Sequence, residues 1–243
     1  MEKHLVLTAL LTCLVLPAAS AGMADGFARY ATAGSLKPFA RDFGGILGSG
    51  LYATGRSLGF SGFDVGMRVT GQFSPSGGNT IAKNSGQNFM YLPWVQAEIG
   101  MPFRLDGFVR MSNWEGITVS GGGLRWGITK VNDRPYALQA MLVGAGHTAV
   151  NRSFSATHFS GNLVVSMKTP WTTPYIGAGL DHTRLMVMEA TANPELVGAD
   201  ITTNDYRATV GLHTKIARFG YLNAAFNFMH GEPGMEAAAG LRF

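Results

Sequence analysis

The sequence is short of cysteine, of charge and of long apolar runs. Its 243 residues include one cysteine, Cys13, and 14% are charged, whereas about a quarter of the residues in a soluble globular protein are charged. Beyond Cys13 the chain has no thiol and can form no disulfide. After the first twenty residues no apolar run approaches the roughly 18 residues that a membrane-spanning helix needs. If the chain crosses a membrane, it does so with strands.

Other absences exclude several functions. The formal net charge is +4 and the basic residues are dispersed, so no basic run or basic helix predicts nucleic-acid binding. No two acidic residues are adjacent, so the paired acids of a protease are absent. The histidines after His4 stand far apart with no i,i+2 pair, so we expect no metal site. The glycine-rich runs lack a following Lys-Ser/Thr pair, so no cofactor is expected either.

The first 21 residues have the pattern of a signal peptide. Lys3 and His4 precede an apolar run from Leu5 to Leu16, and Ala19-Ser20-Ala21 is a small-x-small cleavage site. Cys13 lies inside this segment, with Thr12 before it rather than the small residue typical of a lipoprotein. The mature chain is expected to begin at Gly22.

The last nine residues form an alternating strand that ends on an aromatic ring. Met235, Ala237, Ala239, Leu241 and Phe243 share one face, and smaller or charged residues share the other. This pattern resembles the closing strand of bacterial outer-membrane β-barrels, one face of which meets lipid. The resemblance implies a place in the bacterial outer membrane, contact with its lipid, and Phe243 as the signal that the β-barrel assembly machinery reads.

From residue 62 to residue 243 the apolar residues recur with a period of two, which predicts strands. We expect ten of them, an even number, closing into an all-β antiparallel transmembrane barrel. They are Phe63–Phe73, Leu92–Met101, Gly107–Ser112, Gly116–Thr129, Tyr136–His147, Phe154–Lys168, Tyr175–Val187, Tyr206–Ile216, Tyr221–His230 and Met235–Phe243. The long connections, 74–91 and 188–205, fall on alternate links, which predicts that they are extracellular and that both chain ends are periplasmic.

Charged residues on these strands share the parity that faces the lumen, because charge on the lipid face costs about 2–4 kcal/mol at the midplane. The lumen-lining residues predicted in this way are Asp64, Arg68, Glu98, Arg110, Arg125, Lys168, Asp181, Arg207, His213, Lys215, Glu236 and Arg242. They would form either an interior ion-pair network or a path for solute, with a slight excess of bases that favours anions.

Aromatic residues gather near the predicted strand ends, where they would anchor the barrel at the two membrane interfaces. They are Phe103, Tyr136, Trp171, Tyr221 and Phe243 on the periplasmic side, and Phe73, Phe89, Tyr91, Trp114, Phe154 and Phe228 on the outer side.

Residues 22–61 differ from the rest. Ser35 is a candidate cap for an amphipathic helix whose apolar stripe is Leu36, Phe39, Phe43, Ile46 and Leu47, with glycines that weaken and then end it. This segment is either a plug at the periplasmic mouth or a helix that covers an apolar patch or lies on the membrane's inner face. The run from Leu58 to Gly66 resembles the start of small uncharacterised outer-membrane proteins in which an N-terminal helix leads into the barrel.

Three functions remain open. The composition favours a non-enzymatic narrow pore or structural barrel for small or amphipathic solutes. His158 and Ser160 share a strand face and resemble the His-x-Ser of outer-membrane phospholipases, but no carboxylate or amide follows one hairpin later to orient the base. The third function is adhesion through the two long loops.

Overall fold

The computed structural model describes residues 22, 24 and 26–243, so the predicted signal peptide over residues 1–21 lies outside the described residues. Within them are three α-helices, two 3-10 turns and ten strands. The helices are α2 (Phe27–Tyr30), α3 (Ala33–Gly48) and α4 (Thr80–Asn84). The strands are β1 (Phe63–Gln72), β2 (Met90–Gly100), β3 (Leu105–Trp114), β4 (Ile117–Gly127), β5 (Leu138–Val150), β6 (Phe154–Met167), β7 (Thr173–Val187), β8 (Asp200–Lys215), β9 (Gly220–Met229) and β10 (Glu232–Arg242).

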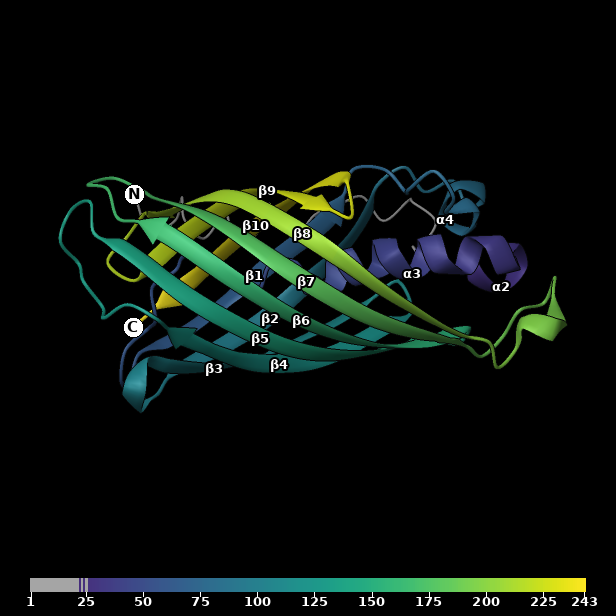
Figure 1. Ribbon diagram of the computed structural model, residues 1–243, viewed down its shortest axis with the longest axis horizontal. Helices are drawn as coiled ribbons and strands as arrows, with labels where there is room; N and C mark the ends of the chain where they lie inside the picture. The colour runs from purple at the N-terminus through teal and green to yellow at the C-terminus, as the bar shows by residue number, and fades with distance from the viewer. Residues whose placement is uncertain (1–21, 23, 25) are drawn as a thin grey trace, which may run out of the picture.

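The ten strands form one closed antiparallel barrel (Figure 1). Each strand pairs with its neighbours in the sequence, and β1 closes the barrel against β10, with Val69 opposite Ala237. The predicted fold class and number of strands are confirmed. The largest boundary difference is at β8, which begins at Asp200 rather than Tyr206, so the connection before it is shorter than expected.

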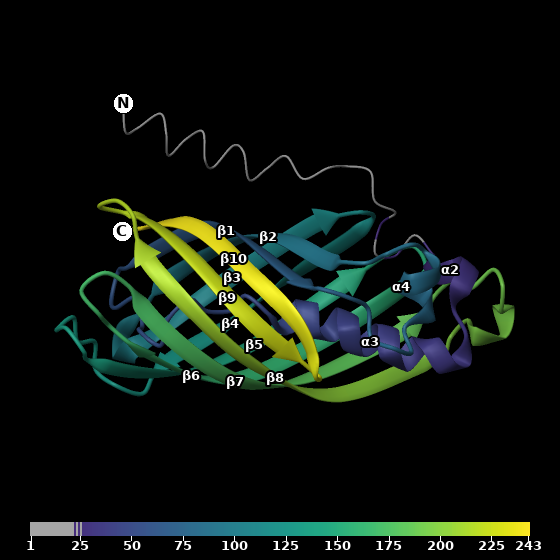
Figure 2. The ribbon, with the colours of Figure 1, turned by 90° about the horizontal axis from the view of Figure 1, so that it is seen from above.

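The two ends of the barrel differ. At one end lie Phe243 and the connections 101–104, 128–137, 168–172 and 216–219, and we call it the turn end. The other, the loop end, has the two longest connections, 73–89 and 188–199. Strands β5 to β8 are the longest and extend past β1, β9 and β10 at the loop end (Figures 1 and 2).

The first helix of the described residues lies at the loop end, not beside Phe243. The Ala28 carbonyl oxygen in α2 accepts a hydrogen bond from the Ala192 N–H at 3.3 Å, in the β7–β8 loop. At the turn end Phe243 pairs with Phe63, at the beginning of β1. The described N-terminal residues and Phe243 thus lie at opposite ends of the barrel, because residues 33–61 run along its inside (Figure 2). The periplasmic location of the two chain ends stays a prediction.

The outer face is apolar, as the alternation predicts. Exposed side chains there include Val109, Leu124, Leu142, Phe159, Leu163, Ile176, Leu180, Val210, Leu212, Leu222 and Leu241. Two outward-facing charges, Arg184 and Asp200, stand on the loop-end extension of β7 and β8, and the Arg184 Nε donates to Asp200 at 2.7 Å. No helix in the described part of the chain is long and apolar enough to cross a membrane.

The inner face departs from the predicted polar pattern at the loop end. An apolar cluster lies there inside the barrel, and its strand residues are Met90, Leu92, Trp94, Ile117, Val119, Ala149, Phe154, Ala156, Leu185 and Val187. The reason is α3, whose predicted stripe packs against them. Phe154 is the centre of this contact, with its ring 4.9 Å from Phe27, 5.3 Å from Phe39 and 5.5 Å from Phe43.

The helix α3 begins earlier than Ser35. Thr32 is the N-cap, and its N–H donates a hydrogen bond to the Ser35 Oγ at 2.9 Å, so Ser35 is the third helical residue and completes the cap from inside. Three aromatic residues expected at the membrane interfaces face inward, and one of them, Trp114, packs against the apolar cluster. Phe154 packs on α3, and the Tyr221 hydroxyl donates to Asp64 at 2.8 Å.

Candidate functional site: a lumen filled by residues 33–61

The lumen is occupied by the N-terminal segment, which we call the plug and define as residues 33–61. Its helical part, α3, lies mainly against β7 and β8 and ends midway along the barrel, and residues 49–61 continue to the turn end (Figures 1 and 2). The plug therefore lies in the lumen with its helix toward the loop end, whereas one of the two predicted alternatives put a plug at the mouth on the other side. The physical reason is the inward apolar cluster, in which the stripe of α3 is buried against the wall.

Arginines of the barrel wall bind the main chain where α3 ends. Arg110 donates to the carbonyl oxygens of Leu47 and Ser49, Arg68 to that of Gly50 at 3.0 Å, and Arg125 to that of Leu51. The last carbonyls of a helix have no partner within it and carry partial negative charge. Buried guanidinium groups satisfy both needs, so the wall caps the helix.

The carboxylates around this cap hold the arginines and the plug in place. Glu98 forms salt bridges with both Arg68, at 2.7 Å, and Arg125. Glu236 accepts a hydrogen bond from the Gly50 N–H at 2.7 Å. All these side chains are buried, and buried charges persist only when they are paired and hydrogen-bonded.

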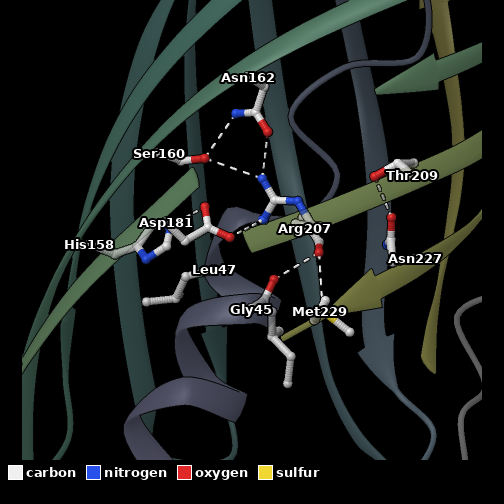
Figure 3. Close-up of polar contacts among 12 residues, drawn as sticks. Gly45, Leu47, His158, Ser160, Asn162, Asp181, Arg207, Thr209, Asn227 and Met229 are labelled. Carbon is white, nitrogen blue, oxygen red and sulfur yellow. Dashed lines mark hydrogen bonds and ion pairs between the residues drawn. The ribbon is translucent and has the colours of Figure 1, made fainter. Parts of the chain in front are cut away.

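A second polar network lies beside the last turn of α3, on β6, β7 and β8 (Figure 3). Arg207 pairs with Asp181 at 2.9 Å and donates to Asn162 at 2.7 Å and to Ser160 at 3.2 Å. His158 stands 3.5 Å from Asp181 through Nε2. Every member of this network is less than a tenth exposed, so it is part of the interior and not of the lipid-facing surface.

This geometry does not form a nucleophile and base. The Ser160 hydroxyl accepts hydrogen bonds from Asn162, at 2.9 Å, and from Arg207, while the His158 Nδ1 bonds the Thr183 hydroxyl at 3.0 Å. Among the described contacts there is no hydrogen bond between His158 and Ser160, and a serine nucleophile requires one to its base.

Glycines allow α3 to approach the wall closely. A Cβ added to Gly48 would overlap Arg207 and lie 2.5 Å from Asp181, and one added to Gly44 would overlap the Thr183 hydroxyl. The expectation that these glycines mainly weaken the helix is therefore incomplete. They lie on its wall-facing side, where only hydrogen fits.

The middle of α3 is fixed by a buried carboxylate. Asp42 accepts hydrogen bonds from Gln72 at 3.0 Å and from Asn79 at 2.7 Å, and pairs with His230 at 3.1 Å. Asn79 begins α4 in the β1–β2 loop, and the other long loop binds α2. The two long loops predicted to act in adhesion thus make contacts that hold the N-terminal helices.

The predicted lumen-lining residues occupy two zones. Asp64, Arg68, Glu98, Arg110, Arg125, Asp181, Arg207, His213 and Glu236 are buried, and Lys168, Lys215 and Arg242 line the mouth at the turn end. Sequence reasoning missed Trp94, whose ring lies 3.9 Å from the Arg110 guanidinium, and His147, whose Nε2 accepts from Arg110 at 2.7 Å. Trp94 could have been found from the sequence, because it is one of several apolar residues at positions of β2 that face inward.

No group of three or more metal-binding side chains occurs in the described part of the chain. The sequence matches no family model and no curated protein. Several solved structures are similar. The N-terminal β-barrel domain of Pseudomonas aeruginosa OprF has a TM-score of 0.41 and 12% identity, with 76% of this chain and 99% of that one covered.

Two further structures are similar over the same region. Neisserial surface protein A has a TM-score of 0.32 and 13% identity, with 74% of this chain and 95% of that one covered. The attachment invasion locus protein Ail of Yersinia pestis has a TM-score of 0.33 and 10% identity, with 76% and 99% covered. The predicted closed antiparallel barrel of ten strands is confirmed by the strand pairing itself. At these identities the similarity concerns the fold alone.

Proposed function

We propose that this protein is a bacterial outer-membrane β-barrel that acts as a narrow channel held closed by its own plug. The observation that carries the proposal is the set of hydrogen bonds between the main chain of residues 47–58 and buried side chains of the wall. Any solute path through the lumen requires this segment to move. All these bonds are non-covalent, so the closure is reversible.

The outer face supports the membrane location. Its exposed aliphatic side chains surround a closed barrel with no free strand edge, which is the form that lipid requires. The proposal places the turn end in the periplasm, makes outer-membrane lipid a partner, and gives Phe243 the role of assembly signal for the β-barrel assembly machinery. Deleting Phe243 should then reduce membrane insertion of the chain in cells.

Charge in the middle of the lumen indicates which solutes an open form would favour. The buried bases there are Arg68, Arg110, Arg125 and Arg207, and the buried acids at the same levels are Asp64, Glu98, Asp106, Asp181 and Glu236. With the plug in place, main-chain carbonyls satisfy three of these arginines. Withdrawal of the plug removes those acceptors, so in an open lumen these three arginines would be the groups that bind an anion.

A disulfide between plug and wall tests the channel directly. A Cβ at Gly44 would lie 3.1 Å from the Thr183 Cβ, close to the roughly 3.8 Å of a disulfide, and the predicted mature chain has no other cysteine. We expect Gly44→Cys/Thr183→Cys to be silent in planar bilayers when oxidised and to conduct when reduced. Gly44→Cys alone controls for the substitution, and deletion of residues 22–53 should conduct steadily.

Equal conductance with and without reductant would show that the plug does not gate a path. If neither the reduced double variant nor the deletion variant conducts, while circular dichroism shows that both are folded, the channel proposal is wrong. The remaining function would be that of a structural barrel.

The lipid-hydrolase hypothesis has a separate test. Because the Ser160 hydroxyl accepts from Arg207 and Asn162, we expect no hydrolysis of phospholipid by the native protein in mixed micelles, and none by Ser160→Ala. Native activity that the substitution abolishes would reinstate His158 and Ser160 as a catalytic pair.

A further inference from the structure

We propose that the turn end of the barrel holds a binding site for one small oxyanion, such as a phosphate group, formed jointly by the wall and the plug. A cavity of about 50 Å³ lies there. Its lining includes Lys168, Lys215 and Arg242 from the wall and Arg56 from the plug, with Asp133 as the acid among its lining residues. This inference goes beyond channel closure and does not require the lumen to open.

The cations of this cavity exceed the carboxylates that pair with them. Arg56 and Lys168 share Asp133, at 3.0 Å and 3.4 Å. Arg242 pairs with Asp64 at 2.8 Å. Lys215 has no ion-pair or side-chain hydrogen-bond partner among the described residues. Four cations therefore pair with only two carboxylates, and Lys215 is the cation without a carboxylate partner.

One residue that lines this cavity carries a buried atom without a partner. His213 lines the cavity and is 4% exposed, yet its Nδ1 has no hydrogen-bond partner in the described structure. A buried polar atom in a native protein is nearly always hydrogen-bonded. An oxyanion in the cavity would accept a bond from this ring as well as from Lys215.

The other lining groups suit an oxyanion. Thr54 and Thr173 supply hydroxyl groups, and Gln139 supplies an amide, all of which donate hydrogen bonds. Bonds from charged donors to phosphate are roughly twice as strong as neutral ones. The cavity admits a single small group, so the ligand is either a free ion or the exposed terminal group of a larger molecule.

Isothermal titration of the complete mature protein in detergent tests the site. We expect inorganic phosphate to bind, and Lys215→Gln to weaken it about tenfold, the effect of one charged hydrogen bond. Lys215→Arg should retain most of the affinity. Asp133→Asn should bind more tightly, because it removes the competing carboxylate. Arg134→Gln is the matched control. Arg134 is an exposed base on the connection that carries Asp133, and it does not line the cavity.

Three probes distinguish the sources of the anion. Inorganic phosphate tests the free ion, glycerol 3-phosphate tests a monoester on a larger molecule, and acetate tests a single carboxylate. Tighter binding of the monoester than of phosphate would assign a headgroup or glycan. Absence of binding by all three, or equal loss in Lys215→Gln and Arg134→Gln, would overturn the proposal. Circular dichroism of each variant establishes that the barrel is folded.

Discussion

Arg110, on β3, donates a hydrogen bond to the carbonyl oxygen of Leu47 in the last turn of α3. Within the described residues Arg110 has no salt bridge to a carboxylate, and its guanidinium lies 3.9 Å from the ring centre of Trp94. The carbonyl oxygens at the end of α3 and the ring of Trp94 thus stabilise the buried guanidinium, a role that a carboxylate usually has. The buried charge is stable only while the plug is in place.

Arg110→Gln should make the plug more mobile while the barrel stays folded. The shorter amide loses the Trp94 contact and leaves at least one carbonyl of the Leu47–Ser49 turn without a partner, which costs about 1–3 kcal/mol. Hydrogen exchange measured by mass spectrometry should rise in residues 47–58 and stay constant in the strands. Arg218→Gln, on the exposed β8–β9 connection, is the control. Unchanged exchange in the plug would contradict the capping role.

Asp181→Asn should be strongly destabilising. It leaves the guanidinium of Arg207, 1% exposed, without its carboxylate, and breaking a buried pair in this way costs about 3–5 kcal/mol. Urea unfolding in lipid vesicles measures the loss. Asp200→Asn removes the partner of Arg184 on the exposed loop-end extension and should change stability little. Comparable losses in the two variants would show that the interior network is solvated.

Two glycines of α3 should respond in opposite directions to alanine. A Cβ at Gly34 meets nothing within 4 Å, so Gly34→Ala should stabilise the protein by up to about 1 kcal/mol through helix propensity. A Cβ at Gly48 would separate Arg207 from Asp181, so Gly48→Ala should cost about 1–3 kcal/mol. The same unfolding assay compares them. Stabilisation by both would mean that α3 does not press against β7 and β8.

The salt bridge between Arg56 of the plug and Asp133 of the β4–β5 connection should weaken only at acidic pH. Hydrogen bonding from Arg56, with a smaller contribution from Lys168, lowers the pKa of Asp133 below its ordinary 3.8. Lys215 and Arg242 also line this cavity and act in the same direction. Because the folded pKa is depressed, the stabilisation is complete above 3.8 and is lost as the pH falls through the folded value.

Carbon NMR of the Asp133 carboxyl should show this shift. The midpoint should lie below 3.8 in the native protein and move back toward 3.8 in Arg56→Gln. A native midpoint at or above 3.8 would mean that Arg56 does not bind there in solution.

The sequence predicts the barrel well because alternation carries the required information. On β6, Phe159 and Leu163 face outward and Ser160 and Asn162 face inward, as the period of two requires. The number of strands follows from counting such segments. The start of β8 was missed because Thr202 to Asp205 is polar on both faces, and the ladder with β7 alone extends the strand to Asp200.

The position of the plug could not be read from periodicity. The stripe of α3 shows that one helix face needs a partner and does not say which. Leu185 and Val187 have the parity of Asp181 on β7, and Phe154 has the parity of Ser160 on β6. These inward positions were predicted to be polar, yet they carry apolar residues. That mismatch was the available signal. The pairing of arginines with main-chain carbonyls has no sequence signature, because every residue has a carbonyl.

The path of residues 33–61 fixes an order of assembly. The chain enters at the loop end, leaves at the turn end and only then begins β1, whose pairing with β10 closes the wall. A helix about 10–12 Å across with its side chains cannot be drawn afterwards through a ring of buried arginines. The wall therefore closes around the plug during assembly, rather than receiving the plug afterwards.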